Sequence, residues 1–222
     1  SGASETFRNL FMTGGAYSDG ADGTSSGKTY LTNAWLAGGA WTVTQGHSTE
    51  LGGALALAGG TITIKRANDT TRPTTLTLRG PTVISNTTSG AYAPLTLGGG
   101  SAVNIVGGRV VLSNDLTCIG SALNTNPVQI VASVPTSGGG WPTLQVGGTR
   151  VFNVTDGAAD PDLRIGAFLT NNNACAGGLV KRESGTLELA GTNGYSLATT
   201  VEAGTLLLSG TTLSPTTVRA GA

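Results

Sequence analysis

Charged side chains are scarce in this sequence. Only 11% of the 222 residues are charged, and 12 Lys and Arg balance 12 Asp and Glu, so the formal net charge is zero. A protein that binds nucleic acid needs a dense basic face to neutralise phosphates, and this composition excludes such a face. No apolar run reaches the roughly 18 residues of a membrane-spanning helix, which excludes a transmembrane helix.

Histidine, cysteine and aromatic residues are also few. His47 is the one histidine, so a Ser-His-Asp triad would have to use it, and zinc sites usually need several His or Cys ligands. We therefore interpret His47 as a surface loop residue and expect neither a metal nor a cofactor. Cys118 and Cys175 permit one disulfide if their Cα atoms lie within roughly 7 Å; two buried free thiols are the alternative.

Glycine and threonine are abundant instead. The chain has 36 Gly and 35 Thr, and 38% of its residues are hydrophobic. Threonine and valine suit a pleated surface, while glycine punctuates strands at corners and bulges. Apolar residues at the 3.6-residue spacing of a capped helix are missing. The composition therefore predicts an all-β protein with a packed core.

An apolar residue, a glycine-rich corner and an alternating apolar strand recur along the chain. The copies lie at 36–43, 57–64, 78–84, 97–105 and 146–152, and a second pair lies at 185–189 and 204–208. A repeat of about 20 residues with short strands is typical of a solenoid. We predict a parallel β-helix with about 19–21 residues per coil, in which inward and outward side chains alternate. A β-sandwich or jelly roll is the alternative.

This fold assigns structural roles to two sets of residues. The inward ladder is predicted to contain Leu36, Leu57, Leu78, Leu97, Leu187 and Leu206. The corner glycines are predicted to be Gly38, Gly59, Gly80, Gly99, Gly147, Gly185 and Gly204. Residues 1–30 are expected to form an N-terminal cap or loop region. Residues 31–222 are expected to form the β-helix, which continues beyond 222 or is capped by a neighbouring subunit.

The segment 177–210 resembles the passenger-associated transport repeat of bacterial autotransporters. It reads GLVK at 178–181, GTLEL at 185–189, GTNGY at 191–195 and TTVEAGTL at 199–206. These match the family phrases G-L-x-K, G-T-L-x-L-x-G-x-N-x-Y and T-x-V-x-x-G-x-L. The resemblance implies a right-handed parallel β-helix, secreted to the outer surface of a Gram-negative-type bacterium, in which the repeat itself carries no catalytic residues.

Acidic residues provide two further candidate sites. Asp156, Asp160 and Asp162 are carboxylates of the kind that β-helical polysaccharide-cleaving enzymes use, although an Asp/Gly/Pro turn explains them equally simply. Asp19 and Asp22 offer oxygen atoms to Ca²⁺, with a plain loop as the alternative. We interpret both segments as turns.

Aromatic residues are candidates for stacking on sugars. Trp35, Trp41 and Trp141 are scattered along the chain, and Trp41 occupies the repeat position of Ile62, which predicts a core role. The expected function is a structural segment of a surface protein, namely a stalk, fibre or adhesin passenger. Its partners would be other copies of itself, surface polysaccharide or a host surface. A carbohydrate-active β-helix enzyme and a glycan-binding module are the alternatives.

Overall fold

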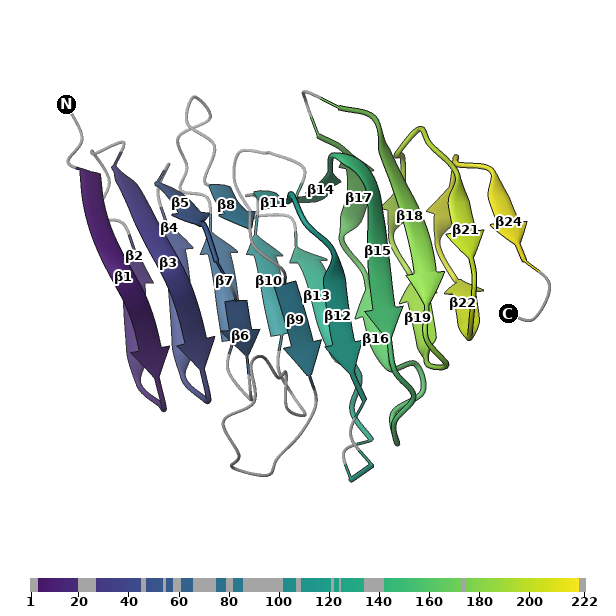
Figure 1. Cartoon of the computed structure of the whole chain (residues 1–222). Helices are drawn as coiled ribbons and strands as arrows, with labels where there is room; N and C mark the ends of the chain where they lie inside the picture. The colour runs from purple at the N-terminus through teal and green to yellow at the C-terminus, as the bar shows by residue number, and fades with distance from the viewer. Residues whose placement is uncertain are drawn as a thin grey trace.

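The structure is a computed structural model that describes residues 4–19, 27–44, 47–53, 55–57, 61–65, 75–78, 82–85, 102–106, 109–120, 122–123, 125–133, 142–172 and 175–219. Every regular element in these ranges is a β-strand (Figure 1). The first twelve strands are β1 (Ser4–Met12), β2 (Ala16–Asp19), β3 (Lys28–Leu36), β4 (Ala40–Thr44), β5 (Ser48–Leu51), β6 (Leu55–Leu57), β7 (Thr61–Lys65), β8 (Thr75–Leu78), β9 (Thr82–Ser85), β10 (Ala102–Val106), β11 (Arg109–Leu112) and β12 (Leu116–Ile119). The others are β13 (Val128–Ser133), β14 (Thr143–Val146), β15 (Gly148–Val154), β16 (Leu163–Ile165), β17 (Phe168–Asn171), β18 (Gly177–Arg182), β19 (Thr186–Leu189), β20 (Thr192–Asn193), β21 (Thr199–Val201), β22 (Thr205–Leu208), β23 (Thr211–Thr212) and β24 (Thr216–Val218).

The strands form two parallel sheets that face each other. One sheet has 16 strands and the other has 8, in the order β2-β4-β7-β10-β13-β16-β19-β22. All strand pairs of the two sheets are parallel, so the chain returns to the same side after each strand of the smaller sheet. Figure 1 shows the result, an elongated stack in which the chain advances steadily from β1 to β24. The predicted all-β parallel β-helix is confirmed.

Each coil contributes up to three strands. From the third coil on, two short strands lie in the large sheet and the third lies in the small sheet, as in β5, β6 and β7. In the second coil the first two strands are continuous as β3, which pairs with β5 through Lys28–Leu31 and with β6 through Ala34–Leu36. Two consecutive residues of β3, Thr32 and Asn33, are both outside the core. This break in the alternation is where the large sheet bends.

The core lies between the sheets and is built from side chains stacked coil upon coil. In the small sheet, hydrogen-bonded neighbours place one apolar residue of each coil above the next. The buried members of this row are Trp41, Ile62, Val103, Ile130, Ile165 and Leu189. Each buried aliphatic side chain of this size contributes roughly 1.5–3 kcal/mol to folding. The continuous row explains why a chain so poor in charge forms a stable rod.

The coil length matches the expectation at both ends of the described chain and exceeds it in the middle. Trp41 and Ile62 are partners 21 residues apart, and Leu187 and Leu206 are partners 19 residues apart. Between them the step rises, for example to 36 residues from Leu116 to Phe152. The strands keep their register because the additional residues lie between strands rather than within them.

The predicted leucine ladder is wrong as a single row. Leu36 and Leu57 are partners in the large sheet, but Leu78 pairs with Leu51, one strand earlier in the coil. Leu187 and Leu206 are partners in the small sheet. All are buried except Leu206, which is partly buried against the core, and Leu97, which lies outside the described residues. The repeated phrase marks two different corners of the coil, so equal phrases do not occupy equal places.

The described members of the predicted corner glycines lie between strands. Gly38, Gly147, Gly185 and Gly204 separate β3 from β4, β14 from β15, β18 from β19 and β21 from β22. Gly59, Gly80 and Gly99 lie outside the described residues. A Cβ on Gly185 would lie 2.6 Å from the carbonyl oxygen of Thr155 on the preceding coil. Glycine at this corner therefore permits two coils to stack closely.

The N-terminal region belongs to the stack. In 1–30, the expected cap or loop region, β1 pairs with β3 over eight residue pairs and β2 pairs with β4. These strands form a coil like those that follow. Within the described ranges no helix has the length and apolarity needed to span a membrane.

Candidate functional site in the C-terminal coils

A buried lysine ties two coils together near the C-terminal end. Lys181 is the fifth residue of β18 and points into the interior, where it is fully buried. Its ammonium group donates hydrogen bonds to the carbonyl oxygens of Arg182 at 2.7 Å, Glu183 at 2.6 Å and Ala203 at 3.1 Å. Ala203 belongs to the following coil. One cation thus satisfies carbonyl groups on both sides of a coil boundary, where they would otherwise be buried without donors.

The backbone at this corner leaves little space for side-chain atoms. Glu183 has a φ of 64° and Gly204 has a φ of 70°, so both lie in the left-handed region. A Cβ on Gly204 would lie 2.6 Å from the carbonyl oxygen of Gly185 and 2.7 Å from Nζ of Lys181. Glycine is therefore required at 204 both for its backbone conformation and for the space that the lysine occupies.

A second set of polar ties lies on the opposite part of the same coils. The buried Asn193 donates from Nδ2 to the carbonyl oxygens of Gly191 at 3.0 Å and Thr211 at 3.1 Å. The hydroxyl of Tyr195 is hydrogen-bonded to Thr199. Thr199 in turn lies 2.9 Å from the hydroxyl oxygen of Ser214. Buried polar groups that are paired in this way fix the register of neighbouring coils.

Burial shifts the pKa values of three interior groups near the lysine. Burial lowers the pKa of Lys181 to about 8, and the nearby carboxyl of Asp162 partly offsets this by raising it. Burial also raises the pKa of Asp162, while its hydrogen bond from the Thr186 amide, at 2.8 Å, lowers it. Burial raises the pKa of the Cys118 thiol to about 12, with Asp162 adding to the rise. These groups are positioned as internal ties and are shielded from solvent.

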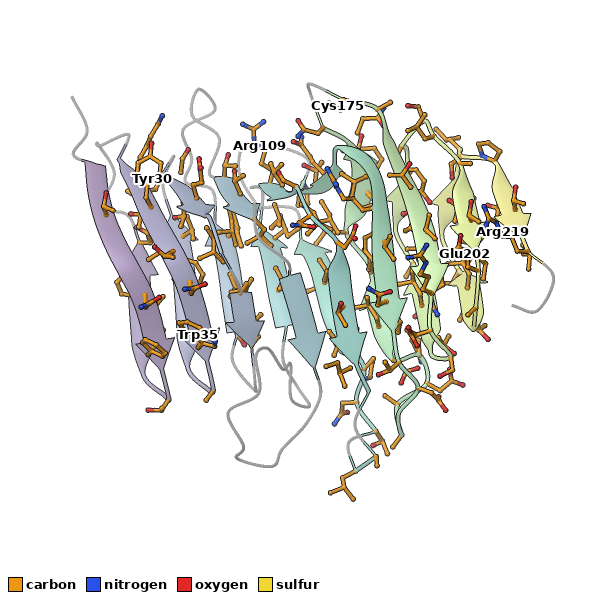
Figure 2. The ribbon with its side chains drawn as sticks, viewed as in Figure 1. Tyr30, Trp35, Arg109, Cys175, Glu202 and Arg219 are labelled. Atoms are coloured by element: carbon orange, nitrogen blue, oxygen red, sulfur yellow. The ribbon has the colours of Figure 1, made fainter. Side chains whose placement is uncertain are left out.

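Charged side chains cover the outer face of the same coils. Glu202 lies between two arginines, with Arg182 Nε 2.6 Å from its Oε2 and Arg219 Nη1 3.1 Å from its Oε1. The hydrogen bond from Arg182 lowers the pKa of Glu202, and the same contact raises the pKa of Arg182. Figure 2 shows Glu202 and Arg219 on neighbouring strands at this end of the stack. Exposed ion pairs of this kind contribute little to stability.

The prediction that His47 is a surface loop residue is wrong. His47 is buried, and its Nε2 lies 3.0 Å from Oδ1 of Asp19 and 2.8 Å from the hydroxyl of Thr29. Thr29 and Thr49 also donate their hydroxyls to the Asp19 carboxylate. Asp19 occupies the same inward position as its neighbour Val43, which explains its burial. In sequence, the match between 16–19 and 40–43 could have revealed that position.

This N-terminal cluster joins three coils. Because the Thr29 hydroxyl proton is given to Asp19, the hydroxyl oxygen is left to accept the proton carried by His47 Nε2. The described residues contain no group of three or more His, Cys, Asp or Glu that would hold a metal ion. Asp22, the partner of Asp19 in the considered calcium loop, lies outside the described residues.

The disulfide between Cys118 and Cys175 is absent, and the structure has both as free thiols. Cys118 lies in β12 and is buried in the core, whereas Cys175 is exposed just before β18 (Figure 2). The alternative of two buried thiols is therefore correct for Cys118 alone. The three acidic candidates also divide, because Asp156 and Asp160 are exposed in the turn between β15 and β16 while Asp162 is buried.

The tryptophans take different roles. Trp41 is fully buried, as the repeat predicts. Trp35 lies on the outer face of the large sheet and stacks on Phe11, with ring centroids 4.5 Å apart and planes 9° apart. Trp141 lies outside the described residues.

One comparison with known proteins gives a match. Residues 179–208 match the family model of the passenger-associated-transport-repeat. This segment is a passenger-associated-transport-repeat. It contains Lys181, Asn193 and Gly204, so the polar ties described above lie within the repeat. No curated protein and no solved structure matches the chain. The repeat indicates a structural segment of a secreted, surface-exposed autotransporter passenger, a structural unit rather than an enzyme.

Proposed function

We propose that this chain is a mechanical β-helical segment, a stalk, fibre or adhesin passenger, on the outer surface of a Gram-negative-type bacterium. The observation that supports the proposal is that the passenger-associated-transport-repeat coincides with the coils that Lys181 and Asn193 tie together. A repeat whose characteristic side chains are used to join coils serves stability of the rod. Chemistry on a substrate would require such groups to be accessible.

The rod itself suits an extracellular role. Its strands pair with neighbours in two continuous parallel sheets, so little backbone in the described strands is available to a protease. Its outer positions carry many threonines and few charges, as in Thr42, Thr63 and Thr77. Such a surface is neutral and hydrogen-bonding, and it is suited to contact with polymers or with other copies.

Labelling of intact cells tests the proposed location. An antibody raised against this chain is applied to living cells of the source bacterium, with a cytosolic protein as the control for leakage. We expect labelling of intact cells and its loss after brief external protease treatment. Detection of the chain only after the cells are lysed would contradict the proposal.

A finer part of the proposal is end-to-end association of β-helical coils. The last described coils expose apolar side chains, namely Leu207, Leu208, Leu213 and Val218, which a further coil stacked on them would bury. Light scattering of the purified chain over a concentration series should show dimers and longer assemblies. The variant Leu213→Asp should remain monomeric, and a wild type that is monomeric throughout would contradict this part.

A further inference from the structure

An aromatic pair and an amide pair lie side by side on the outer face of the first two coils. Phe11 and Trp35 are hydrogen-bonded strand neighbours whose rings stack. Asn9 and Asn33 are also neighbours, and Asn33 donates from Nδ2 to Oδ1 of Asn9 at 3.0 Å. In each strand the amide precedes the aromatic residue by two positions, so the two rows run in parallel about 7 Å apart on one face.

The pair is accessible. Phe11 is 67% exposed, although its size and apolarity would favour burial. Trp35 is partly exposed and lies on the front face of the large sheet in Figure 2. Figure 2 therefore shows a surface that no other described segment covers.

Both rows end in small residues on the third coil. The register places Ala56 beside Trp35, so the ring of Trp35 that Phe11 covers on one side has only a small neighbour on the other. A Cβ on Gly53 would collide with the side-chain oxygen of Asn33, so glycine at 53 leaves that amide in place. The surface is thus two coils wide and steps down beside Trp35 and Asn33.

The chemistry of the surface selects a neutral, amphipathic ligand. Its four side chains are uncharged, so it offers no attraction to a phosphate, a sulfate or an acidic peptide. Aromatic faces carry partial negative charge and attract C–H groups with partial positive charge. A hexopyranose with equatorial hydroxyls presents flat faces of axial C–H groups and a rim of hydroxyls. Aromatic rings beside a few positioned polar groups are the usual lining of small-molecule sites.

We propose that Phe11, Trp35, Asn9 and Asn33 form a binding surface for the sugar units of a neutral β-linked hexose polysaccharide. The sugar ring stacks on the aromatic pair, and its equatorial hydroxyls exchange hydrogen bonds with the amide pair. This inference goes beyond the structural role proposed above and does not rest on it. The sugar surface can be disproved while surface location stands, and the reverse also holds.

Calorimetric titration with cellohexaose and with chitohexaose tests the proposal. We expect saturable binding of at least one of them by the wild type and at least tenfold weaker binding by Trp35→Ala, because stacking on an aromatic side chain contributes a tenfold effect or more. Phe11→Ala should weaken binding and Phe11→Tyr, which keeps the ring, should restore it. Tyr30→Ala is the matched control, because Tyr30 is also an exposed aromatic residue of β3 but lies outside the stack.

Three outcomes would overturn the proposal. The first is no saturable binding of either oligosaccharide by the wild type. The second is binding that Trp35→Ala and Phe11→Ala leave unchanged. The third is equally tight binding of heparin, which would show that charge rather than ring stacking governs recognition. Circular dichroism of each variant shows whether the β-helix is folded, and Phe11→Ala alone decides if Trp35→Ala does not fold, because Phe11 is the more exposed ring.

Discussion

The ammonium nitrogen of Lys181 lies 3.1 Å from the carbonyl oxygen of Ala203, and the Lys181 carbonyl oxygen accepts a hydrogen bond from the amide of Glu202 at 2.9 Å. The same residue therefore joins two coils through its side chain and through its backbone. Because the side chain is buried, no water replaces it if it is removed. This link is the clearest physical reason why the passenger-associated-transport-repeat carries a lysine at this point.

Replacing that lysine should weaken the rod. Lys181→Met keeps most of the apolar volume but removes the donor from three carbonyl groups, each of which then costs free energy as an unpaired buried acceptor. We expect the free energy of unfolding to fall by about 2–4 kcal/mol. Urea denaturation followed by tryptophan fluorescence measures it. A variant as stable as wild type would show that the desolvation of the charge offsets its hydrogen bonds.

The lysine also predicts how stability changes with pH. Its pKa is about 8 in the folded chain against an ordinary 10.5, so above pH 8 the unfolded state holds more protons than the folded state and stability rises with pH. The Cys118 thiol acts in the opposite direction above its ordinary pKa of 9.0, because its folded pKa is about 12. The rise should therefore be clearest between pH 8 and pH 9. Lys181→Met should abolish it, and a rise that persists in this variant would assign it elsewhere.

Two glycines allow the corner's steric cost to be measured separately. Gly204 has a φ of 70° and crowded surroundings, whereas Gly15 has a φ of 77° and no atom within 4 Å of the place where a Cβ would lie. Gly15→Ala should cost about 1–2 kcal/mol for the backbone conformation alone. Gly204→Ala should cost at least about 2 kcal/mol more, because the added carbon meets two carbonyl groups and the lysine. Equal losses in thermal denaturation would mean that the coils separate without cost.

Local repetition predicts the fold well but predicts its phase poorly. The 21-residue step from Trp41 to Ile62 identifies true neighbours because short corners keep strand and corner together. Leu78 follows Leu57 at the same step but belongs to a different strand of the coil, since a glycine-rich corner occurs twice in each turn. Sequence spacing cannot separate the two corners. Long-range register is needed, and it depends on the packing of whole coils.

Buried polar residues were predicted least well. His47 and Asp162 are interior residues whose partners come from other coils, Asp19 and the Thr186 amide respectively. A single polar residue carries no periodic signal that would mark it as inward-facing. The transport repeat was predictable from its phrases, whereas the way its lysine reaches Ala203 depends on how two coils stack.

A core truncation tests whether the apolar rows stabilise the rod. Leu57 is fully buried, so Leu57→Ala should lower the free energy of unfolding by about 2–5 kcal/mol. Leu123 is 85% exposed, so Leu123→Ala should change it by less than about 0.5 kcal/mol. Both are measured by urea denaturation. Comparable losses in the two variants would contradict the placement of Leu57 between the sheets.

The two cysteines should differ in reactivity. Cys175 is exposed and free, so a thiol reagent such as dithionitrobenzoate should modify it in the native protein without prior reduction. Cys118 is buried and its pKa is raised to about 12, so it holds little of the reactive thiolate and should react only after denaturation. The native chain should therefore release one equivalent of chromophore and the denatured chain two. No release from the denatured, unreduced chain would mean that the two residues form a disulfide in the isolated protein. The variant Cys175→Ser separates the signals, because its native form should not react at all.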